Sequence, residues 1–129
     1  MIRKATPLDI KTIQQIRKDC NFMRLSWSVH RLFIALGMVD LLLDENESTI
    51  GYCSFISLFG VSYIIQFGLT PDSRGQGIGS NFLTIMCDRL AGDIWAHTTY
   101  DGATKFFMSN NWSPVYKFHK YTIIRRNGV

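Results

Sequence analysis

The stretch that decides the fold is Tyr63-Ile-Ile-Gln-Phe-Gly-Leu-Thr-Pro-Asp-Ser-Arg-Gly-Gln-Gly-Ile-Gly-Ser-Asn-Phe-Leu83. Its first part, from residue 62 to residue 69, is β-rich and mostly apolar, which is typical of a central strand. Pro-Asp-Ser at 71–73 has turn chemistry. The glycines at 75, 77 and 79 then precede a helix and leave main-chain N–H groups unshielded by side chains. Because such groups point out of the first turn of a helix, the stretch predicts a site for a phosphate or pyrophosphate.

The spacing of these glycines discriminates between phosphate-binding loops. No Gly-Lys-Ser/Thr follows, which excludes the Walker pattern, and residues 75–79 read G-x-G-x-G rather than the G-x-G-x-x-G of dinucleotide-binding folds. The segment Arg74-Gly-Gln-Gly77-Ile-Gly79 resembles the acyl-CoA loop of the GNAT family of N-acetyltransferases, Q/R-x-x-G-x-G/A. A glycine-rich turn that only links a strand to a helix is the alternative. The strand–loop–helix context favours the CoA interpretation.

A second motif, Ala103-Thr-Lys-Phe-Phe-Met-Ser-Asn-Asn-Trp112, is similar to the family's A-x-x-F-Y-x-x-x-G-F. Phe107 stands where many members carry tyrosine, and Asn111 stands where they carry glycine. Asparagine also tolerates the left-handed conformation, so only the change at 107 concerns the mechanism. The resemblance covers essentially the whole chain. It implies a single domain over residues 1–129, an α/β fold built as a GNAT-like three-layer α/β/α sandwich with a mixed, mostly antiparallel central sheet.

Capping residues and periodicity predict the elements before the first motif. A strand at 2–6 leads to a helix with Thr6 as N-cap, Pro7 in its first turn and Asp9 completing a capping box. Its apolar side is expected to consist of Leu8, Ile10, Ile13 and Ile16. Ser28 is expected to cap a second short helix with Gly37 at its end and one apolar face made of Val29, Leu32, Phe33 and Leu36. Segments 38–43 and 49–58 then form a hairpin, and Phe59-Gly60 turns the chain into the central strand.

The elements after the glycine loop follow from the same signals. A helix beginning near Gln76 carries an apolar stripe of Ile78, Phe82, Ile85, Met86 and Leu90. A strand runs over 94–98, and Asp101 is expected to cap a last helix at 102–109, which stops at Asn110-Asn111. Residues 115–126 are strand-rich and fit either a tight hairpin or one long strand.

Composition bounds the class of protein. The 129 residues carry a formal charge of +4, with 47% hydrophobic residues and a pI near 9.1. No apolar run approaches the roughly 20 residues that span a bilayer, and the first six residues lack a signal-peptide core. Cys20, Cys53 and Cys87 are odd in number and widely separated, which indicates buried free thiols in a reducing cytoplasm and no metal site. The positive charge suits an acidic ligand such as CoA; nucleic acid binding is possible but not favoured, because basic residues cluster only near the C-terminus.

The GNAT resemblance implies where acetyl-CoA binds. Main-chain groups of Phe67 and Leu69 would pair with the pantetheine arm beside a splayed strand, with Gly68 as a bulge. Amides from Gln76 to Ser80 would hold the pyrophosphate, with Arg74 adding charge nearby. The expected CoA-binding residues are Phe67, Gly68, Leu69, Arg74, Gly75, Gln76, Gly77, Ile78, Gly79, Ser80 and Phe107.

The resemblance also implies direct transfer of the acetyl group to an acceptor amine in a ternary complex. The acceptor could be a protein lysine, an N-terminus or a small amine, and the loop 21–27 is the candidate for specificity. Gln66 occupies a site-facing position but cannot take a proton, whereas His97 near a strand end is the best placed of the three histidines, the others being His30 and His119. A structural histidine with its polar atoms satisfied is nevertheless the simpler interpretation of His97. With Phe107 lacking a hydroxyl, Tyr100 or Tyr116 could protonate the leaving thiolate.

A second hypothesis is a catalytically weak GNAT-like module that binds CoA and acts through protein or nucleic-acid interaction. Phe107 and the lack of a carboxylate on the central strand favour it, and the intact glycine loop argues against it. Cys53 could act as an acyl-accepting nucleophile, although a buried strand cysteine is the simpler interpretation. Either a monomer or a homodimer is compatible with the sequence.

Overall fold

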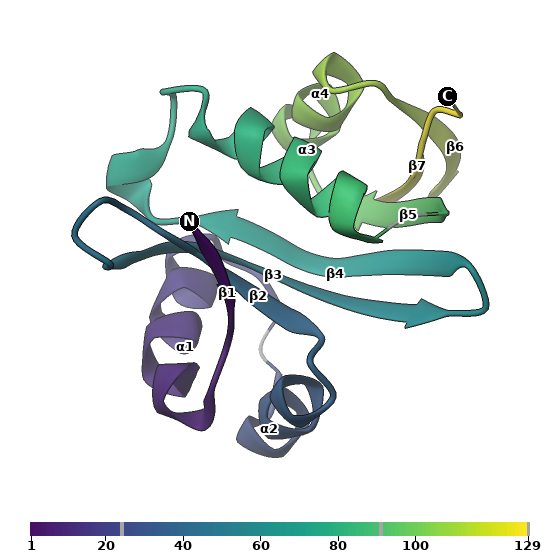
Figure 1. The fold of residues 1–129 in the computed structure, drawn as a ribbon. Coiled ribbons are helices and arrows are strands. Elements are labelled where there is room, and N and C mark those ends of the chain that lie inside the picture. The colour runs from purple at the N-terminus through teal and green to yellow at the C-terminus, as the bar shows by residue number, and fades with distance from the viewer. Residues whose placement is uncertain (24, 91, 129) are drawn as a thin grey trace. The chain divides into compact units, whose positions relative to one another are not determined.

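A computed structural model describes residues 1–23, 25–90 and 92–128. The strands are β1 (Ile2–Lys4), β2 (Val39–Leu43), β3 (Thr49–Leu58), β4 (Val61–Leu69), β5 (Asp93–Thr98), β6 (Trp112–Phe118) and β7 (Tyr121–Arg126). The helices are α1 (Ile10–Asp19), α2 (Trp27–Ala35), α3 (Ile78–Leu90) and α4 (Asp101–Ser109), with short 3-10 turns η1 (Pro7–Asp9) and η2 (Pro71–Ser73). Hydrogen bonding orders the strands β1-β2-β3-β4-β5-β7-β6 (Figure 1). The predicted α/β class with a mixed, mostly antiparallel sheet is confirmed.

Contacts divide the chain into two compact units. The first contains residues 1–55 and 66–79, and the second contains residues 56–65 and 80–129. Strands β3 and β4 each contribute residues to both units.

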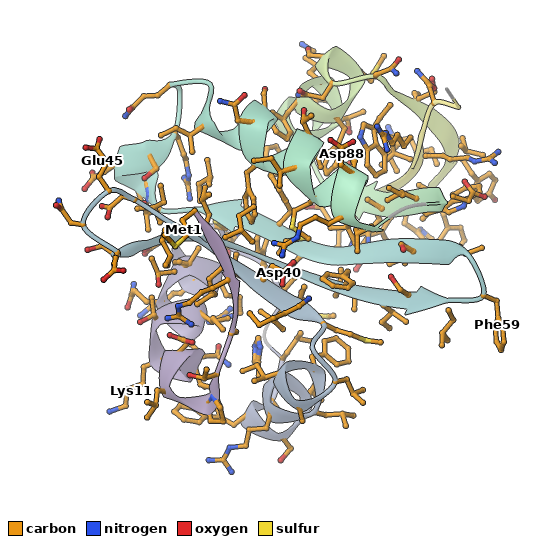
Figure 2. The ribbon with its side chains drawn as sticks, in the orientation of Figure 1. Met1, Lys11, Asp40, Glu45, Phe59 and Asp88 are labelled. Atoms are coloured by element: carbon orange, nitrogen blue, oxygen red, sulfur yellow. The ribbon has the colours of Figure 1, made fainter. Side chains whose placement is uncertain are left out.

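The core of the first unit lies where α1 and α2 pack on β1, β2 and the first part of β3 (Figure 1). Its fully or nearly fully buried apolar side chains are Ile10, Ile13, Ile16, Ile34, Val39, Leu41, Leu43 and Tyr52. Every residue of β2 is buried, including Asp40, which Figure 2 labels. The Lys4 ammonium lies 2.9 Å from the Asp40 carboxylate, so this buried charge is paired with an opposite one.

The start of the first helix agrees with the prediction except at one residue. Thr6 and Asp9 form the capping box, and Arg3 holds the Asp9 carboxylate through two bonds of 2.9 Å. The predicted apolar role of Leu8 is wrong, because its side chain is 94% exposed. Leu8 lies in the 3-10 turn η1, before the 3.6-residue period that aims Ile10 and Ile13 at the core begins.

The second helix begins two residues earlier than predicted. Ser26, not Ser28, is its N-cap, and the Ser26 Oγ accepts a hydrogen bond from the Val29 N–H at 3.2 Å. The buried residues of the helix are His30 and Ile34. The predicted inward positions of Leu32 and Leu36 are therefore wrong, since both side chains are exposed. Gly37 ends the helix as expected, with a φ of +70°.

In the second unit, Phe59 and Gly60 form the β3–β4 turn with φ values of +53° and +77°, and Phe59 stands at its tip (Figure 2). β4 pairs in parallel with β5, from Val61 opposite Asp93 to Ile64 opposite Ala96. β5 pairs antiparallel with β7, and β6 with β7, so the segment near the C-terminus is a hairpin that turns at His119 and Lys120. This settles the alternative that the sequence left open.

The helices of the second unit correct two details. The buried residues of α3 are Phe82, Leu83, Met86 and Cys87, and the predicted inward position of Ile85 is wrong because it is 45% exposed. The N-cap of α4 is Tyr100 rather than Asp101, which is the first helical residue. Asn111 has a φ of +72°, which confirms the left-handed stop.

Candidate functional site

The glycine loop connects the end of β4, through η2, to the first residue of α3 at Ile78. Gly75 and Gly77 have φ values of +75° and +77°, which side chains other than glycine rarely adopt. A Cβ atom added at either residue would meet nothing within 4 Å, so this side of the loop faces open space. The first four N–H groups of α3 have no acceptor within their own helix. The loop therefore fits a phosphate group, with main-chain amides as the donors.

Two side chains of this loop are engaged inside the protein. The Arg74 guanidinium donates to the Leu69 carbonyl at 3.2 Å through Nη2, and the same nitrogen lies 3.4 Å from the Asp19 carbonyl and 3.2 Å from the Cys20 Sγ. The Gln76 amide donates to the Asp72 carbonyl at 2.8 Å. These bonds fix the shape of the loop and tie it to the end of α1. Arg74 therefore stabilises the loop through its contacts and also places a positive charge beside it.

Gly68 has a packing role that the sequence did not reveal. A Cβ atom at this position would lie 2.8 Å from the Cys20 Sγ and 2.8 Å from Cε2 of Phe22. Both distances are well below ordinary contact, so only glycine lets the segment after α1 approach β4 this closely. The neighbouring Phe67 is half-buried and Leu69 is buried.

Gln66 lies on β4 at the centre of a short buried hydrogen-bond chain. The Tyr52 hydroxyl donates to the Gln66 Oε1 at 2.7 Å, and the Gln66 Nε2 donates to the Met23 carbonyl at 2.9 Å. Tyr52 and Gln66 are both buried. Burial raises the pKa of the Tyr52 phenol far above its usual range, so it remains a neutral donor.

The segment from Cys20 to Leu25, which links α1 to α2, is held by side chains of α1 as well. The Arg17 guanidinium donates to the Phe22 carbonyl at 2.9 Å, and the Gln14 amide donates to the Leu25 carbonyl at 3.3 Å. Most of the candidate specificity loop 21–27 is thus anchored through its main chain, and Arg24 within it lies outside the described residues.

The second unit brings together Tyr63 of β4 and His97 of β5. Tyr63 lies opposite Trp95 in the parallel ladder, so His97, two residues further along, shares a face with it. The Tyr63 hydroxyl and the His97 Nδ1 are 2.5 Å apart, and the two rings stack with centroids 5.7 Å apart. Tyr121 of β7 places its ring edge-on to His97 at 5.7 Å. The sequence indicated His97 as a candidate but not Tyr63. The pair becomes evident only when β4 and β5 are known to run parallel with Tyr63 opposite Trp95.

Burial sets the protonation of this pair. Desolvation lowers the pKa of His97 below its ordinary value and raises the pKa of Tyr63 above its own. Both side chains are therefore neutral at pH 7. A neutral histidine in hydrogen-bond contact with a neutral phenol can accept one proton, a role for which the central strand offers no carboxylate.

The other candidates lie in different surroundings. Tyr100 and Tyr116 are both exposed, the first at the N-cap position of α4 and the second on β6. His30 is buried, and neither ring nitrogen has a hydrogen-bond partner. His119 occupies the β6–β7 turn against the Phe118 ring.

Cys53 is buried on β3. Phe107 is buried on α4, and its ring meets Trp112 edge-on with centroids 4.9 Å apart.

Two properties of the described residues concern metals and membranes. Across residues 1–23, 25–90 and 92–128, no group of three or more His, Cys, Asp or Glu side chains is arranged to hold a metal ion. In the same ranges no helix is long and apolar enough to cross a bilayer.

The fold and the glycine loop define the class of the protein as an α/β protein with a mixed seven-stranded sheet and a loop with two positive-φ glycines between β4 and α3. A family model described as "Acetyltransferase (GNAT) family" matches residues 10–109. The chain belongs to this family of acetyltransferases, as the sequence resemblance predicted.

Solved structures with the same fold include several acetyltransferases. The PaiA N-acetyltransferase of Thermoplasma acidophilum, in complex with coenzyme A, superposes with a TM-score of 0.84 at 12% identity over 99% of this chain and 98% of that one. Ard1 of Thermoplasma volcanium gives a TM-score of 0.81 at 14% identity over 98% and 95% of the two chains. Arabidopsis thaliana Naa50, in complex with the bisubstrate analogue CoA-Ac-MVNAL, gives 0.80 at 18% identity over 99% and 98%. No curated protein sequence matches this chain. At these identities the likeness establishes the fold.

Proposed function

We propose that this protein is an N-acetyltransferase that moves an acetyl group from acetyl-CoA to an acceptor amine by direct attack in a ternary complex. The observation that carries the proposal is the Tyr63–His97 pair, in which a neutral imidazole and a neutral phenol are 2.5 Å apart. Membership of the acetyltransferase family supplies the reaction class, and the pair supplies the base that the reaction requires.

The glycine loop is the proposed site for the diphosphate of acetyl-CoA. Its main-chain amides from Gln76 to Ser80 are the donors, and Arg74 holds the loop in shape through Leu69 and Cys20. Several structural relatives were solved with coenzyme A or with a CoA-linked analogue, which supports the same donor here. Main-chain groups of Phe67 and Leu69 remain the proposed partners of the pantetheine arm.

The proton of the acceptor amine passes to the Tyr63–His97 pair. If the Tyr63 hydroxyl donates to Nδ1, the phenol oxygen takes the amine proton while its own proton moves to the imidazole. If Nδ1 carries the hydrogen, the free Nε2 takes the proton instead. In both tautomers the nitrogen–carbon bond forms, the carbon–sulfur bond breaks, CoA leaves as a thiolate and the imidazole becomes imidazolium.

The lowered pKa of His97 favours an acceptor that is itself easily deprotonated. A lysine ammonium has a pKa near 10.4, so freeing its lone pair at pH 7 costs about 4.6 kcal/mol. An α-amine has a pKa of about 8, for which the cost is about 1.4 kcal/mol. We therefore propose that the acceptor is an α-amine, either at the N-terminus of a peptide or on a small molecule.

The competing function is a CoA-binding module with little turnover, and Phe107 is the specific observation that favours it. This buried side chain offers no hydroxyl to the leaving thiolate where many family members have a tyrosine. Acetyl-CoA binding without turnover on any amine would establish that function instead.

The test is CoA release, measured with peptides that carry either a free N-terminus or a blocked N-terminus and a free lysine. We expect turnover with the free N-terminus, and a loss of roughly 10²–10⁴-fold in kcat/KM for both Tyr63→Phe and His97→Gln. The rate should rise with pH and level off near pH 8, whereas a lysine acceptor would keep the rate rising toward pH 10. Full activity in His97→Gln would remove the pair from the mechanism.

A further inference from the structure

We propose that one face of the sheet in the second unit binds single-stranded nucleic acid, with aromatic side chains stacking on bases and cations contacting phosphates. The proposal is separate from acetyl transfer. It concerns the basic residues near the C-terminus, which the proposed function does not use. The strand register shows that these residues lie beside a row of rings.

Aromatic side chains from four strands share one face of this sheet. In the β4–β5, β5–β7 and β6–β7 ladders, residues opposite each other point to the same side, as do residues two apart on one strand. The face defined in this way, called the aromatic face below, carries Tyr63, Trp95, His97, Tyr116, Phe118, Tyr121, Ile123 and Arg125. All of these residues belong to the second unit.

The opposite face of the same strands packs inside the unit. Its buried side chains are Ile64, Ile94, Ala96, Thr98 and Ile124. Helix α4 contacts β5, β6 and β7, and its Thr104 hydroxyl lies 2.6 Å from the Thr98 hydroxyl. The core of the unit therefore lies on this side of the strands, and the aromatic face is turned away from α4.

Two rings of the aromatic face are largely open to solvent. Tyr116 is 62% exposed and Phe118 is 55% exposed, both on the edge strand β6. Cross-strand aromatic pairs also stabilise sheets, but rings that stay more than half exposed bury little area in the fold. Exposed apolar side chains that gather in this way mark a binding surface.

The charge of the second unit is complementary to a polyanion. Its sequence has six basic and three acidic residues, a net charge of +3, whereas the first unit has a net charge of +1. The acidic residue of these four strands, Asp93, is already paired with Arg125 at 2.7 Å. Among the described residues, no carboxylate lies within ion-pair distance of Lys117 or Lys120, which flank the hairpin turn. The hairpin thus offers positive charge to an anionic partner.

Cations also lie directly beside the rings. The guanidinium carbon of Arg125 is 5.1 Å from the centre of the Trp95 ring, and the Lys120 Nζ is 5.5 Å from the centre of the Tyr121 ring. A single strand of nucleic acid repeats the matching pair, a flat base and a phosphate, in every nucleotide. Proteins bind such strands with rings that stack on bases and a positive surface that follows the backbone.

The same chemistry disfavours other anions. In a duplex the bases stack on one another, so their faces are closed to protein side chains. An acidic peptide supplies the charge without a ring in each unit. A single strand is therefore the occupant that uses both the rings and the cations of this face.

The test is fluorescence anisotropy with labelled oligonucleotides of about 12 units in about 50 mM salt, without acetyl-CoA or an acceptor amine. Three probes carry the comparison: oligothymidylate, an abasic strand with the same number of phosphates, and a duplex of the same length. Oligothymidylate should bind at least about tenfold more tightly than the abasic strand and the duplex. Equal affinity for oligothymidylate and the abasic strand would reduce the interaction to charge and overturn the proposal.

Variants locate the site. Phe118→Ala and Tyr116→Ala should each weaken binding of oligothymidylate at least about fivefold, and Lys120→Gln should flatten the dependence of log K on log salt by about 0.7. The matched controls are Phe59→Ala, a fully exposed ring at the β3–β4 turn, and Lys11→Gln, an exposed cation on α1 (Figure 2). Both should bind within about twofold of the wild type.

Three further outcomes would overturn the proposal. The first is a wild-type protein that binds no oligonucleotide at about 100 μM. The second is a loss in Phe59→Ala as large as that in Phe118→Ala. The third is a glutamate peptide of equal charge that competes as well as unlabelled oligothymidylate, which would make the partner an acidic protein segment. Because the assay involves no acetyl transfer, a protein that acetylates no amine would refute the proposed function and leave this result unaffected.

Discussion

Gly77→Glu should weaken acetyl-CoA binding at least about tenfold in a protein that remains folded. Gly77 has a φ of +77°, so any side chain there adds strain of about 1–2 kcal/mol. Nothing lies within 4 Å of the position that a Cβ would occupy, so the substitution causes no clash with the protein. The glutamate would instead place a negative charge where the diphosphate is proposed to bind. For two phosphate charges at about 5 Å, the repulsion is about 1.7 kcal/mol even with the dielectric constant of water, and more where water is excluded.

The assay is isothermal titration calorimetry with acetyl-CoA, alongside urea denaturation of the same samples. Gly77→Ala carries the strain without the charge and should bind within a few-fold of the wild type, whereas Gly77→Glu should bind at least about tenfold more weakly. Gly37→Glu is the matched control: Gly37 has a φ of +70° and open space around its Cβ position, but it ends α2. It should lose similar stability and keep its affinity. Equal affinity in Gly77→Glu and Gly37→Glu would refute the assignment of the loop.

Three further substitutions test the packing, the buried histidine and the missing hydroxyl. Gly68→Ala should lower the free energy of unfolding by about 1–3 kcal/mol in urea denaturation, because its Cβ would lie 2.8 Å from atoms of Cys20 and Phe22. The control Gly128→Ala, which has open space around its Cβ position, should change it by no more than about 0.5 kcal/mol. Equal losses in the two variants would contradict the close approach at Gly68. Burial lowers the pKa of folded His30 below its unfolded value of about 6.5, so the free energy of unfolding should fall as the pH drops below about 6.5, by up to about 1.4 kcal/mol per pH unit. His30→Leu should reduce that slope in denaturation midpoints measured from about pH 7.5 to about pH 5. An unchanged slope would show that His30 does not titrate on unfolding. Phe107→Tyr should raise kcat about tenfold or more by supplying a proton donor for the leaving thiolate. The buried hydroxyl should lower the free energy of unfolding by about 1–3 kcal/mol. A folded variant with unchanged kcat would show that residue 107 lies away from the leaving group.

The elements that depend on local chemistry could be predicted from the sequence. The Thr6–Asp9 capping box, the turn at Phe59-Gly60 and the left-handed Asn111 each follow from residues within three or four positions, and the structure has all of them. The same holds for the glycine loop, because its two positive φ values are conformations that only glycine adopts readily. Backbone-determined features of this kind need no knowledge of distant residues.

The errors concern which face of a helix is buried. The face expected for α2 included Leu32 and Leu36, whereas its buried residues are His30 and Ile34. Apolar composition could not decide between the two faces, since the true interior includes a histidine. Hydropathy alone does not predict a buried histidine with two unpaired nitrogens.

Partners of functional side chains could not be predicted because they come from other strands and helices. The bond between Tyr63 and His97 depends on the parallel register of β4 and β5, and the chain from Tyr52 through Gln66 to Met23 joins two strands to a loop. Arg74 was expected to contribute charge, and only the fold reveals that its guanidinium binds Leu69, Asp19 and Cys20. The sequence identified the residue types that matter, and tertiary contacts determine what each one does.

The balance between the two proton transfers explains how an active enzyme could tolerate Phe107. A thiol has a pKa of about 8.5, so releasing it as a thiolate at pH 7 costs about 2 kcal/mol. Without a base, a lysine acceptor would cost about 4.6 kcal/mol and an α-amine about 1.4 kcal/mol. For a lysine the larger cost falls on the acceptor, whereas for an α-amine it falls on the thiolate. The proposed base, His97 held by Tyr63, would offset the acceptor's cost in either case. A protein with the base in place and no hydroxyl at 107 is therefore suited to an acceptor of low pKa. With such an acceptor, release of the thiolate is the more costly step, at about 2 kcal/mol.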